Sequence, residues 1–349
     1  MGRQKVGIRD VAREAGVSVT TVSHILNNVE YARASDETRA RVRATAEALG
    51  YRPNRMARSL RLQRSEMVGF LSEDIATTPH AGRIILGAQE AAREAGLTLV
   101  LVNTSRSLDD ASRETQVLLR QQVDGILYAT MFHRILDVPD RLTEVPSVLI
   151  DAEDSSGRVP GVVPDEAGGA EAAVEELVSY GHTRIGFLTN DEDVPATRGR
   201  LQGYRDSLDR AGITFDPTLV IARTSETAGG YEAALELFSR PNRPTALFCY
   251  NDRMAMGAYR AAAERGLRIP EDLSVVGFDN QEIVADGLFP GLTTVELPHY
   301  EMGQWAMRHL VQVMSNRETT AHPPGTHPAT SPHVLPCPLV RRDSVTHRP

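Results

Sequence analysis

Residues 16–28 read GVSVTTVSHILNN, a small and β-branched stretch whose only ionisable side chain is His24. Propensity alone would favour a strand here, because Val and Thr are common in sheets. The residues in front of it indicate otherwise. Ile8, Val11 and Ala15 form an apolar stripe at helical spacing, so a first helix precedes the stretch. We therefore predict that residues 16–28 hold the turn and second helix of a helix-turn-helix, since tertiary packing overrides a weak propensity.

The spacing around Gly16 fits this motif. A helix-turn-helix needs a small residue where its helices cross, a turn glycine with positive φ, and an apolar residue inside the second helix. Ala12, Gly16 and Val22 supply these in order, and Ser18 is suited to cap the second helix. The inner face of that helix then comprises Val22, Ile25 and Leu26. Its outward face comprises Val19, Thr20, Ser23, His24 and Asn27.

A third helix is predicted to follow, beginning at a cap on Ser35. Its inward residues are Val42, Ala46 and Leu49. Three helices in about 45 residues can form a small core, which suits a DNA-binding headpiece.

The charge is divided unequally along the chain. Residues 1–65 carry 13 basic and 6 acidic side chains, whereas the remaining 284 residues carry 25 basic and 40 acidic ones. A small basic segment joined to a large acidic body indicates that only the segment meets a polyanion.

From Met67 to about Pro298, apolar β-rich runs alternate with amphipathic helical stretches. The predicted strands are residues 67–71, 97–103, 124–130, 146–151, 184–190, 245–251 and 273–280. Continuous apolar strands that alternate with helices predict parallel sheets covered on both faces. About 280 residues are many for one sheet, so we expect two similar lobes.

Polar residues end many of these strands, and parallel sheets bind ligands beyond the carboxyl ends of their strands. The residues concerned are Asp74, Asp151, Asn190, Asn251 with Asp252, and Asp279 with Asn280. Any one of them could instead be a helix cap or an Asx turn. Several at one cleft are better explained by a ligand site.

The sequence offers no catalytic or cofactor motif. There is no G-x-G-x-x-G after a strand, no P-loop, and no H-E-x-x-H, C-x-x-C or G-x-S-x-G. His322, His327 and His333 lack metal-ligand spacing and suit a solvated loop. We expect no enzyme activity, no metal and no cofactor.

The two cysteines favour a reducing, cytoplasmic setting. Cys249 and Cys337 both lie in apolar strand-like runs, as reduced core residues do. The first ten residues contain no apolar signal region, and no run of about 18 apolar residues could span a bilayer. We expect no membrane association.

The sequence resembles the lactose-repressor/galactose-repressor (LacI/GalR) family along nearly its whole length. IRDVAREAGVSVTTVSHILNN (8–28) and ETRARVRATAEALGYRPNRMARSL (37–60) resemble the headpiece and hinge of that family. GAQEAAREAG, VDGILY, GHTRIGFL, RGRLQGYRDSL, FCYNDRMAMGAYRAAAERGLRIPEDLSVVGFDN and LTTVELP resemble its effector-binding core in order and spacing. The headpiece match is highly specific, whereas periplasmic sugar-binding proteins share the core.

The resemblance implies an all-α helix-turn-helix headpiece (1–52), a hinge helix (53–65) and a two-lobed α/β core (66–349) of the periplasmic-binding-protein type. The first lobe would comprise about 66–164 and 295–325, and the second about 165–294 and 326–349. The partners implied are double-stranded operator DNA, a sugar-like small-molecule effector and a second copy of the chain. Because no leucine-heptad tail follows PLVRRDSV, we expect a dimer and hence a pseudopalindromic operator.

The resemblance also implies which residues meet DNA. Val19, Thr20 and His24 fall on base-reading positions, and His24 stands where many members have arginine. Leu60 falls where the family wedges an apolar side chain into the minor groove, which kinks the DNA. The full set of positions is Ile8, Ser18, Val19, Thr20, Thr21, Ser23, His24, Asn27, Asn54, Arg55, Ala57, Arg58 and Leu60.

In the core, Arg198, Asn251 and Asp279 fall on positions that hydrogen-bond effector hydroxyls, and Asp151 is a fourth candidate. Arg198 could instead pair with a neighbouring acid such as Asp191 or Asp193. His80 and Ala81 replace a pair of aromatics that many members carry, so an aromatic platform is missing or built elsewhere. The candidates for it are Phe132, Tyr250 and Phe278.

With these residues we expect a repressor whose DNA binding is controlled by an effector. The effector either releases the repressor from DNA or, as a corepressor, strengthens its binding to DNA. A purine- or nucleoside-responsive corepressor-type regulator and a solute sensor without specific DNA recognition are the alternatives.

Overall fold

The computed structural model describes residues 6–26, 34–51, 64–78, 81–319 and 331–348. It divides into two compact units, Met1–Ser65 and Glu66–Pro349. The expected hinge residues Asn54, Arg55, Ala57, Arg58 and Leu60 lie outside the described residues, as do Asn27 and His80.

The described part of the first unit holds three helices, α1 (Ile8–Ala15), α2 (Val19–Leu26) and α3 (Asp36–Ala48). Val11, Val22, Ile25 and Val42 are fully buried where the helices meet. Gly16 ends α1 with a φ of 65°, as the turn requires. The helix prediction for the opening stretch is therefore confirmed.

Side chains fix the ends of these helices. Ser18 Oγ accepts the backbone N–H of Thr21 at 3.0 Å, and Ser35 Oγ accepts that of Thr38 at 3.3 Å. Arg41 on α3 donates its Nε–H to the carbonyl of Ala15 at 3.2 Å, which joins the third helix to the end of the first. Both predicted caps are present.

The second unit contains two six-stranded sheets. Their strand orders are β11-β5-β4-β3-β1-β2 and β12-β10-β9-β8-β6-β7, and every pair is parallel except β10 with β12. The strands are β1 Met67–Glu73, β2 Thr98–Thr104, β3 Gly125–Leu136, β4 Ser147–Asp154, β5 Gly161–Pro164, β6 Ile185–Asn190, β7 Val220–Arg223, β8 Ala246–Cys249, β9 Ser274–Asp279, β10 Thr293–Glu296, β11 His333–Leu335 and β12 Leu339–Val340. All seven predicted strands form, and the expectation of two similar lobes is confirmed.

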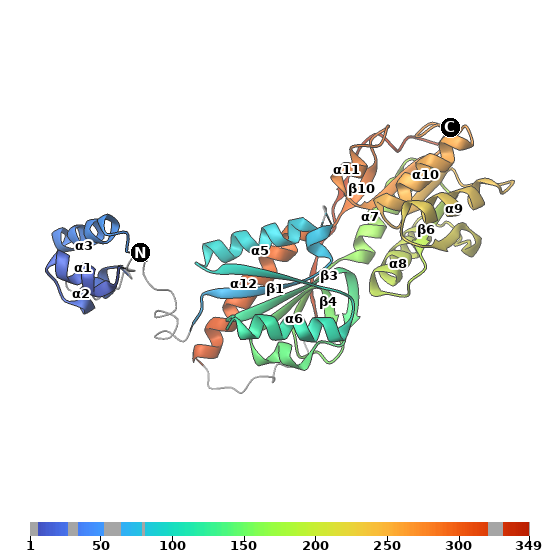
Figure 1. Cartoon of the computed structure of the whole chain (residues 1–349). Helices are drawn as coiled ribbons and strands as arrows, with labels where there is room; N and C mark the ends of the chain where they lie inside the picture. The colour runs from blue at the N-terminus through green and yellow to red at the C-terminus, as the bar shows by residue number, and fades with distance from the viewer. Residues whose placement is uncertain (1–5, 27–33, 52–63, 79–80, 320–330, 349) are drawn as a thin grey trace. The chain divides into compact units, whose positions relative to one another are not determined.

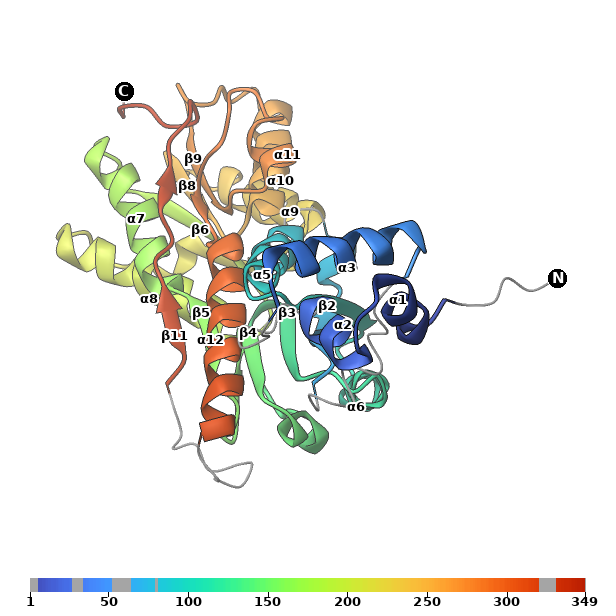
Figure 2. The same ribbon diagram turned by 90° about the vertical axis from the view of Figure 1, so that its left-hand side faces the viewer.

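Helices cover both faces of each sheet. They are α5 Gly82–Glu94, α6 Leu108–Arg120, α7 Glu166–Ser179, α8 Pro195–Arg210, α9 Thr227–Phe238, α10 Asp252–Glu264, α11 Glu282–Ala285 and α12 His299–Thr319, with short 3-10 turns at Ile75–Thr77, Asp140–Glu144 and Pro217–Leu219. In the first lobe α5 and α12 pack together on one face and α6 covers the other (Figure 1). In the second lobe α7 and α8 form one layer and α9 and α10 the other (Figure 2).

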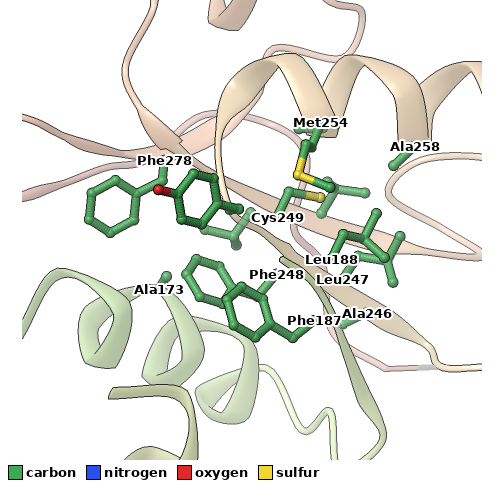
Figure 3. Close-up of a cluster of buried hydrophobic side chains, with 14 of the residues drawn as sticks. Ala173, Phe187, Leu188, Ala246, Leu247, Phe248, Cys249, Met254, Ala258 and Phe278 are labelled. Carbon is green, nitrogen blue, oxygen red and sulfur yellow. The ribbon is translucent and has the colours of Figure 1, made fainter. Parts of the chain in front are cut away.

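The core of the second lobe explains why its strands are apolar throughout. Phe187 and Phe248 stack with ring centroids 4.7 Å apart, and Phe278 packs beside Phe248 (Figure 3). Cys249 and Cys337 are buried free thiols, which agrees with their prediction as reduced core residues.

The chain passes between the lobes at three places, after β5, after β10 and after β11. The crossing backbones bond to one another: Asp165 N donates to Leu335 O and Glu296 N donates to Pro338 O, each at 2.8 Å. One expected lobe boundary is corrected here. Residues 326–349 were expected in the second lobe, but β11 pairs with β5 in the first sheet and only β12 joins the second.

The helix pairs pack through glycine. A Cβ on Gly87 of α5 would lie 2.1 Å from the carbonyl oxygen of Tyr300, and one on Gly303 of α12 would lie 2.1 Å from that of Ile84. The backbones of α5 and α12 can therefore approach closely only because these positions lack side chains.

We expect Gly303→Ala to lower the free energy of unfolding by about 1–3 kcal/mol, because the added methyl forces the two helices apart. Gly82→Ala at the start of α5 is the control, since no described atom lies within 4 Å of its added Cβ. Urea unfolding followed by circular dichroism measures both variants. Equal stability of the two would contradict the close-packing argument.

Candidate functional site

Helix α2 presents a polar surface on the first unit. Ser18, Val19 and Thr20 are exposed, and Thr21, Ser23 and His24 are half-buried. Ile8, also expected at the DNA, is partly buried and packs against the helical core. The described part of the expected reading face is thus small, hydroxyl-rich and carries one imidazole.

A cavity of about 350 Å³ lies between the two lobes of the second unit. Most of its lining comes from the carboxyl ends of strands and the loops that follow them. The first lobe contributes Thr78, Arg106, Met131, Phe132 and Asp151. The second contributes Glu166, Asn190, Asp191, Glu192, Arg200, Thr224, Ser225, Glu226, Tyr250, Asn251, Arg253 and Asp279, and Leu297 lies on a crossing segment.

Arg200 on α8 is the centre of this cavity and is only 3% exposed. Its Nε donates to Glu166 Oε2 at 2.7 Å, its Nη1 donates to the carbonyl of Tyr250, and Nη1 lies 3.6 Å from Asp279 Oδ1. The guanidinium also covers the rings of Phe278 and Tyr250, with 3.7 and 4.3 Å from Cζ to the ring centroids. Burial alone would lower the pKa of Arg200, but the charges of Glu166, Tyr250 and Asp279 raise it, so the residue stays cationic.

Asp151 is a buried carboxylate with one oxygen that has no partner among the described residues. It is 2% exposed, and its Oδ1 has no hydrogen bond within the described part of the chain. Burial raises its pKa well above the ordinary value, and the charges of Glu166 and Asp279 raise it further against the opposing effect of Arg200. A buried acceptor facing a cavity is suited to a donor from a ligand.

Two other predicted residues reach the cavity and also have structural roles. Asn251 Oδ1 accepts the N–H of Met254 at 2.8 Å as the cap of α10, and its Nδ2 donates to Ser225 O at 2.9 Å. Asp279 takes a φ of 100°, and its Oδ2 accepts from Gln281 Nε2 at 2.9 Å. Asn251 is therefore a helix cap and a cavity residue together.

The structure corrects two placements. Arg198 does not line the cavity: its side chain is 54% exposed and pairs with Asp193 at 2.6 Å, the alternative considered for it. Arg200, two residues further along α8, is the arginine that faces the cavity. Phe278 is fully buried beneath that guanidinium instead of lining the cavity, because Asp279 next to it points the other way.

Of the strand-end residues, Asp74, Asp252 and Asn280 do not line the cavity. Asp252 is fully buried and accepts from Thr294 Oγ1 and from the backbone N–H of Gln281, both at 2.6 Å. Phe132 and Tyr250 do reach the lining, so two of the three candidate aromatic rings are present there.

The described residues hold no group of His, Cys, Asp and Glu side chains arranged to bind a metal ion. His333 lies in β11, and its ring stacks on Trp305 with centroids 4.6 Å apart, in place of the solvated loop expected for it. Over the same residues, no helix combines the length and the apolar character that a membrane span needs.

Comparison with known proteins agrees with this organisation. The model of bacterial regulatory proteins of the lacI family matches residues 7–54, and that of the periplasmic binding protein-like domain matches residues 174–345. DegA, an HTH-type transcriptional regulator of Bacillus subtilis (strain 168), is 35% identical over 346 residues, which are 98% of each chain. The ribose operon repressor of Escherichia coli (strain K12) is 34% identical over 306 residues, 87% of this chain and 92% of that one.

Two further relatives extend the comparison. The HTH-type transcriptional repressor PurR of Proteus mirabilis (strain HI4320) is 33% identical over 345 residues, 98% of this chain and 97% of that one. Among solved structures, the lac repressor dimer bound to operator and the anti-inducer ONPF superposes with a TM-score of 0.79 at 28% identity, covering 98% of this chain and all of that one.

A helix-turn-helix unit followed by a two-lobed core around a ligand-sized cavity defines a DNA-binding transcriptional regulator with an effector-binding domain. The chain belongs to the LacI family of bacterial regulatory proteins.

We expect Asp151→Asn to raise the free energy of unfolding at pH 7 by at least about 1 kcal/mol, because the amide has no charge and burial disfavours the carboxylate charge. The pKa of Asp151 is raised in the folded state, so its contribution to stability is present at low pH and is lost as pH rises through the folded pKa. The gain from the variant should therefore shrink toward pH 4. Thermal unfolding across pH 4–8 measures it, and a gain that grows toward acid would contradict the account.

Proposed function

We propose that the chain is a repressor that binds a pseudopalindromic operator as a homodimer and that an uncharged polyhydroxyl effector changes its affinity for DNA. One observation carries this proposal: an outward-facing recognition helix and a cavity lined by many polar side chains occur in the same chain. Repressors release or tighten on DNA only if the effector binds one lobe arrangement better than another. We propose that binding of the effector weakens the affinity for DNA and so releases the repressor.

On the DNA side, Val19, Thr20 and His24 read bases in the major groove, with the remaining predicted positions on phosphates and in the hinge. An arginine can bond guanine O6 and N7 together, a contact worth about 1–3 kcal/mol of discrimination. An imidazole offers a single well-aimed bond. The operator should therefore differ from the family's usual half-site opposite His24.

On the effector side, the polar lining favours a polyol over a planar base. A purine is best held between two ring faces, but Arg200 lies over one face of Tyr250, and Arg106 lies over one face of Phe132, 4.6 Å from its centroid. Neither ring can therefore offer both faces to a planar base. Asp151, Asn251 and Asp279 instead supply fixed oxygen and nitrogen atoms suited to hydroxyl groups.

The charges of the cavity favour an uncharged ligand. Each of its three arginines already has a carboxylate partner: Arg200 with Glu166, Arg106 with Glu192, and Arg253 with Glu226 at 2.8 Å. A phosphate would find no unneutralised cation and would face Asp151. A free sugar such as a pentose is the class that fits, and the relative that represses a ribose operon supports it.

Two further proposals concern where the protein acts and whether it is an enzyme. DNA is the ligand of the first unit, so we propose that the protein acts in the cytoplasm at the nucleoid. The relatives are transcriptional regulators, and we propose no catalytic activity for this chain.

The DNA proposal is tested by selecting palindromic sequences from a random pool with the full-length protein. Fluorescence anisotropy should show at least tenfold tighter binding to the selected DNA than to random DNA, about 1.4 kcal/mol. Selection with His24→Arg should return a different base opposite position 24. Equal affinity for random DNA would refute the repressor, and an unchanged half-site would refute base reading by His24.

The effector proposal is tested with Asp279→Ala. We expect this variant to bind the selected operator within about twofold of the wild type but to lose at least tenfold of the response to an active sugar. D-Ribose, D-ribose 5-phosphate and hypoxanthine form the first panel for anisotropy and thermal shift. Tighter binding of D-ribose 5-phosphate than of D-ribose would contradict the proposal of an uncharged effector. Loss of both operator binding and the sugar response in Asp279→Ala would show that Asp279 is needed for folding.

A further inference from the structure

Arg106 contacts both lobes at once. It lies in the loop after β2, and its guanidinium rests on the ring of Phe132, 4.6 Å from the centroid. The same guanidinium reaches the second lobe, where Nη1 lies 3.4 Å from Oε2 of Glu192 in the loop after β6. All three residues line the cavity, so this contact bridges the cleft across the cavity itself.

The contact lies on the open edge of the cleft. The crossing segments adjoin β5, β10 and β11, at one end of the strand orders, whereas β2 is the opposite edge strand and β6 is next to the opposite edge. The side chains of Arg106 and Glu192 are 49% and 51% exposed, although both line the cavity. They therefore stand where the cavity meets solvent, at the edge that no backbone crossing holds.

The ring beneath Arg106 is held from within the first lobe. Arg134 lies 5.8 Å from the centroid of Phe132 and pairs with Glu73, whose side chain is fully buried. Glu73 Oε1 and Arg134 Nε find no further partner among the described residues. A buried ion pair adds little net stability because desolvation opposes it. The contribution of the pair between Arg134 and Glu73 is to fix the position of Arg134 beside the ring of Phe132.

Among the described residues, the other ion pairs between the lobes involve Arg83, which lies 3.3 Å from Glu282 and 3.5 Å from Glu296. Glu296 ends β10 beside a crossing segment, where the lobes are joined by backbone in any arrangement. Of the ion pairs found between the lobes in the described ranges, that of Arg106 lies where opening of the cleft would separate the partners most.

We propose that Arg106 is the positioning residue that closes the open edge of the cavity, by joining Phe132 of the first lobe to Glu192 of the second. This inference rests on the proposed function in that the enclosed molecule is the effector. Arg106 stabilises the closed arrangement without any ligand and retains the effector once it has entered. Exchange of the effector requires the pair with Glu192 to break.

The test measures the distance between the lobes in the full-length protein. Spin labels on Arg120→Cys of α6 and Asp209→Cys of α8 report it, because both positions are exposed and the native Cys249 and Cys337 are buried. Without ligand, Arg106→Gln and Glu192→Gln should each raise the open population by roughly two- to fivefold, the range of an exposed ion pair. The exchanged pair Arg106→Glu with Glu192→Arg should open the cleft less than Arg106→Glu alone, because it restores the ion pair but not the contact with Phe132.

Arg113→Gln is the matched control, since Arg113 pairs with Asp110 inside the first lobe at 2.9 Å. It should leave the distance distribution unchanged. An unchanged distribution in Arg106→Gln, or an exchanged pair no better than Arg106→Glu alone, would overturn the inference.

A kinetic arm uses D-ribose as the probe. Its dissociation rate should rise by the same two- to fivefold in Arg106→Gln, and an unchanged rate would count against effector retention. The two proposals fail separately: if the wild type prefers no DNA sequence and binds no ribose, the proposed function falls, whereas the distance shift without ligand still decides the role of Arg106.

Discussion

The buried guanidinium of Arg200 is the constraint around which the effector core is arranged. Removing an ion from water costs several kcal/mol, so Arg200 must be met by charge and by hydrogen-bond acceptors at once. Glu166 at the start of α7, Asp279 at the end of β9 and the carbonyl of Tyr250 after β8 meet it from three elements. A shift of any of these elements would remove a partner of the buried charge, so Arg200 ties α7, β9 and the segment after β8 to α8 beside the cavity.

The charges gathered around Arg200 also affect Asp151. Burial raises the pKa of Asp151, and the charges of Glu166 and Asp279, the carboxylates that meet Arg200, raise it further against the opposing effect of Arg200. The side chain comes from the first lobe, while its charged neighbours belong to the second. The capacity of Asp151 to accept a hydrogen bond is thus kept for a molecule between the lobes, at the expense of stability in its absence.

Much of the fold could be predicted because long apolar strands and helical stripes are strong local signals. The strands that were not predicted are short and lie at the sheet edges or beside the crossings between the lobes. β7 and β12 are edge strands, and β5, β10 and β11 adjoin the crossings, where pairing across distant sequence decides the structure. β11 shows the limit clearly: its assignment to a lobe depends on hydrogen bonds to β5, more than 160 residues earlier, which no local pattern encodes.

The sequence allowed the strand ends that line the cavity to be predicted, but not which residue of α8 faces it. Successive helical residues are turned by about 100°, so Arg198 and Arg200 point about 160° apart, and only one of them can face the cavity. The sequence did contain a signal that separates them. Arg200 is three residues before Gly203, whose missing side chain admits the backbone of α7, so Arg200 lies on the face of α8 turned toward α7 and Glu166. The same geometry in a strand, where neighbours alternate, decides that Asp279 reaches the cavity and Phe278 supports Arg200 from below.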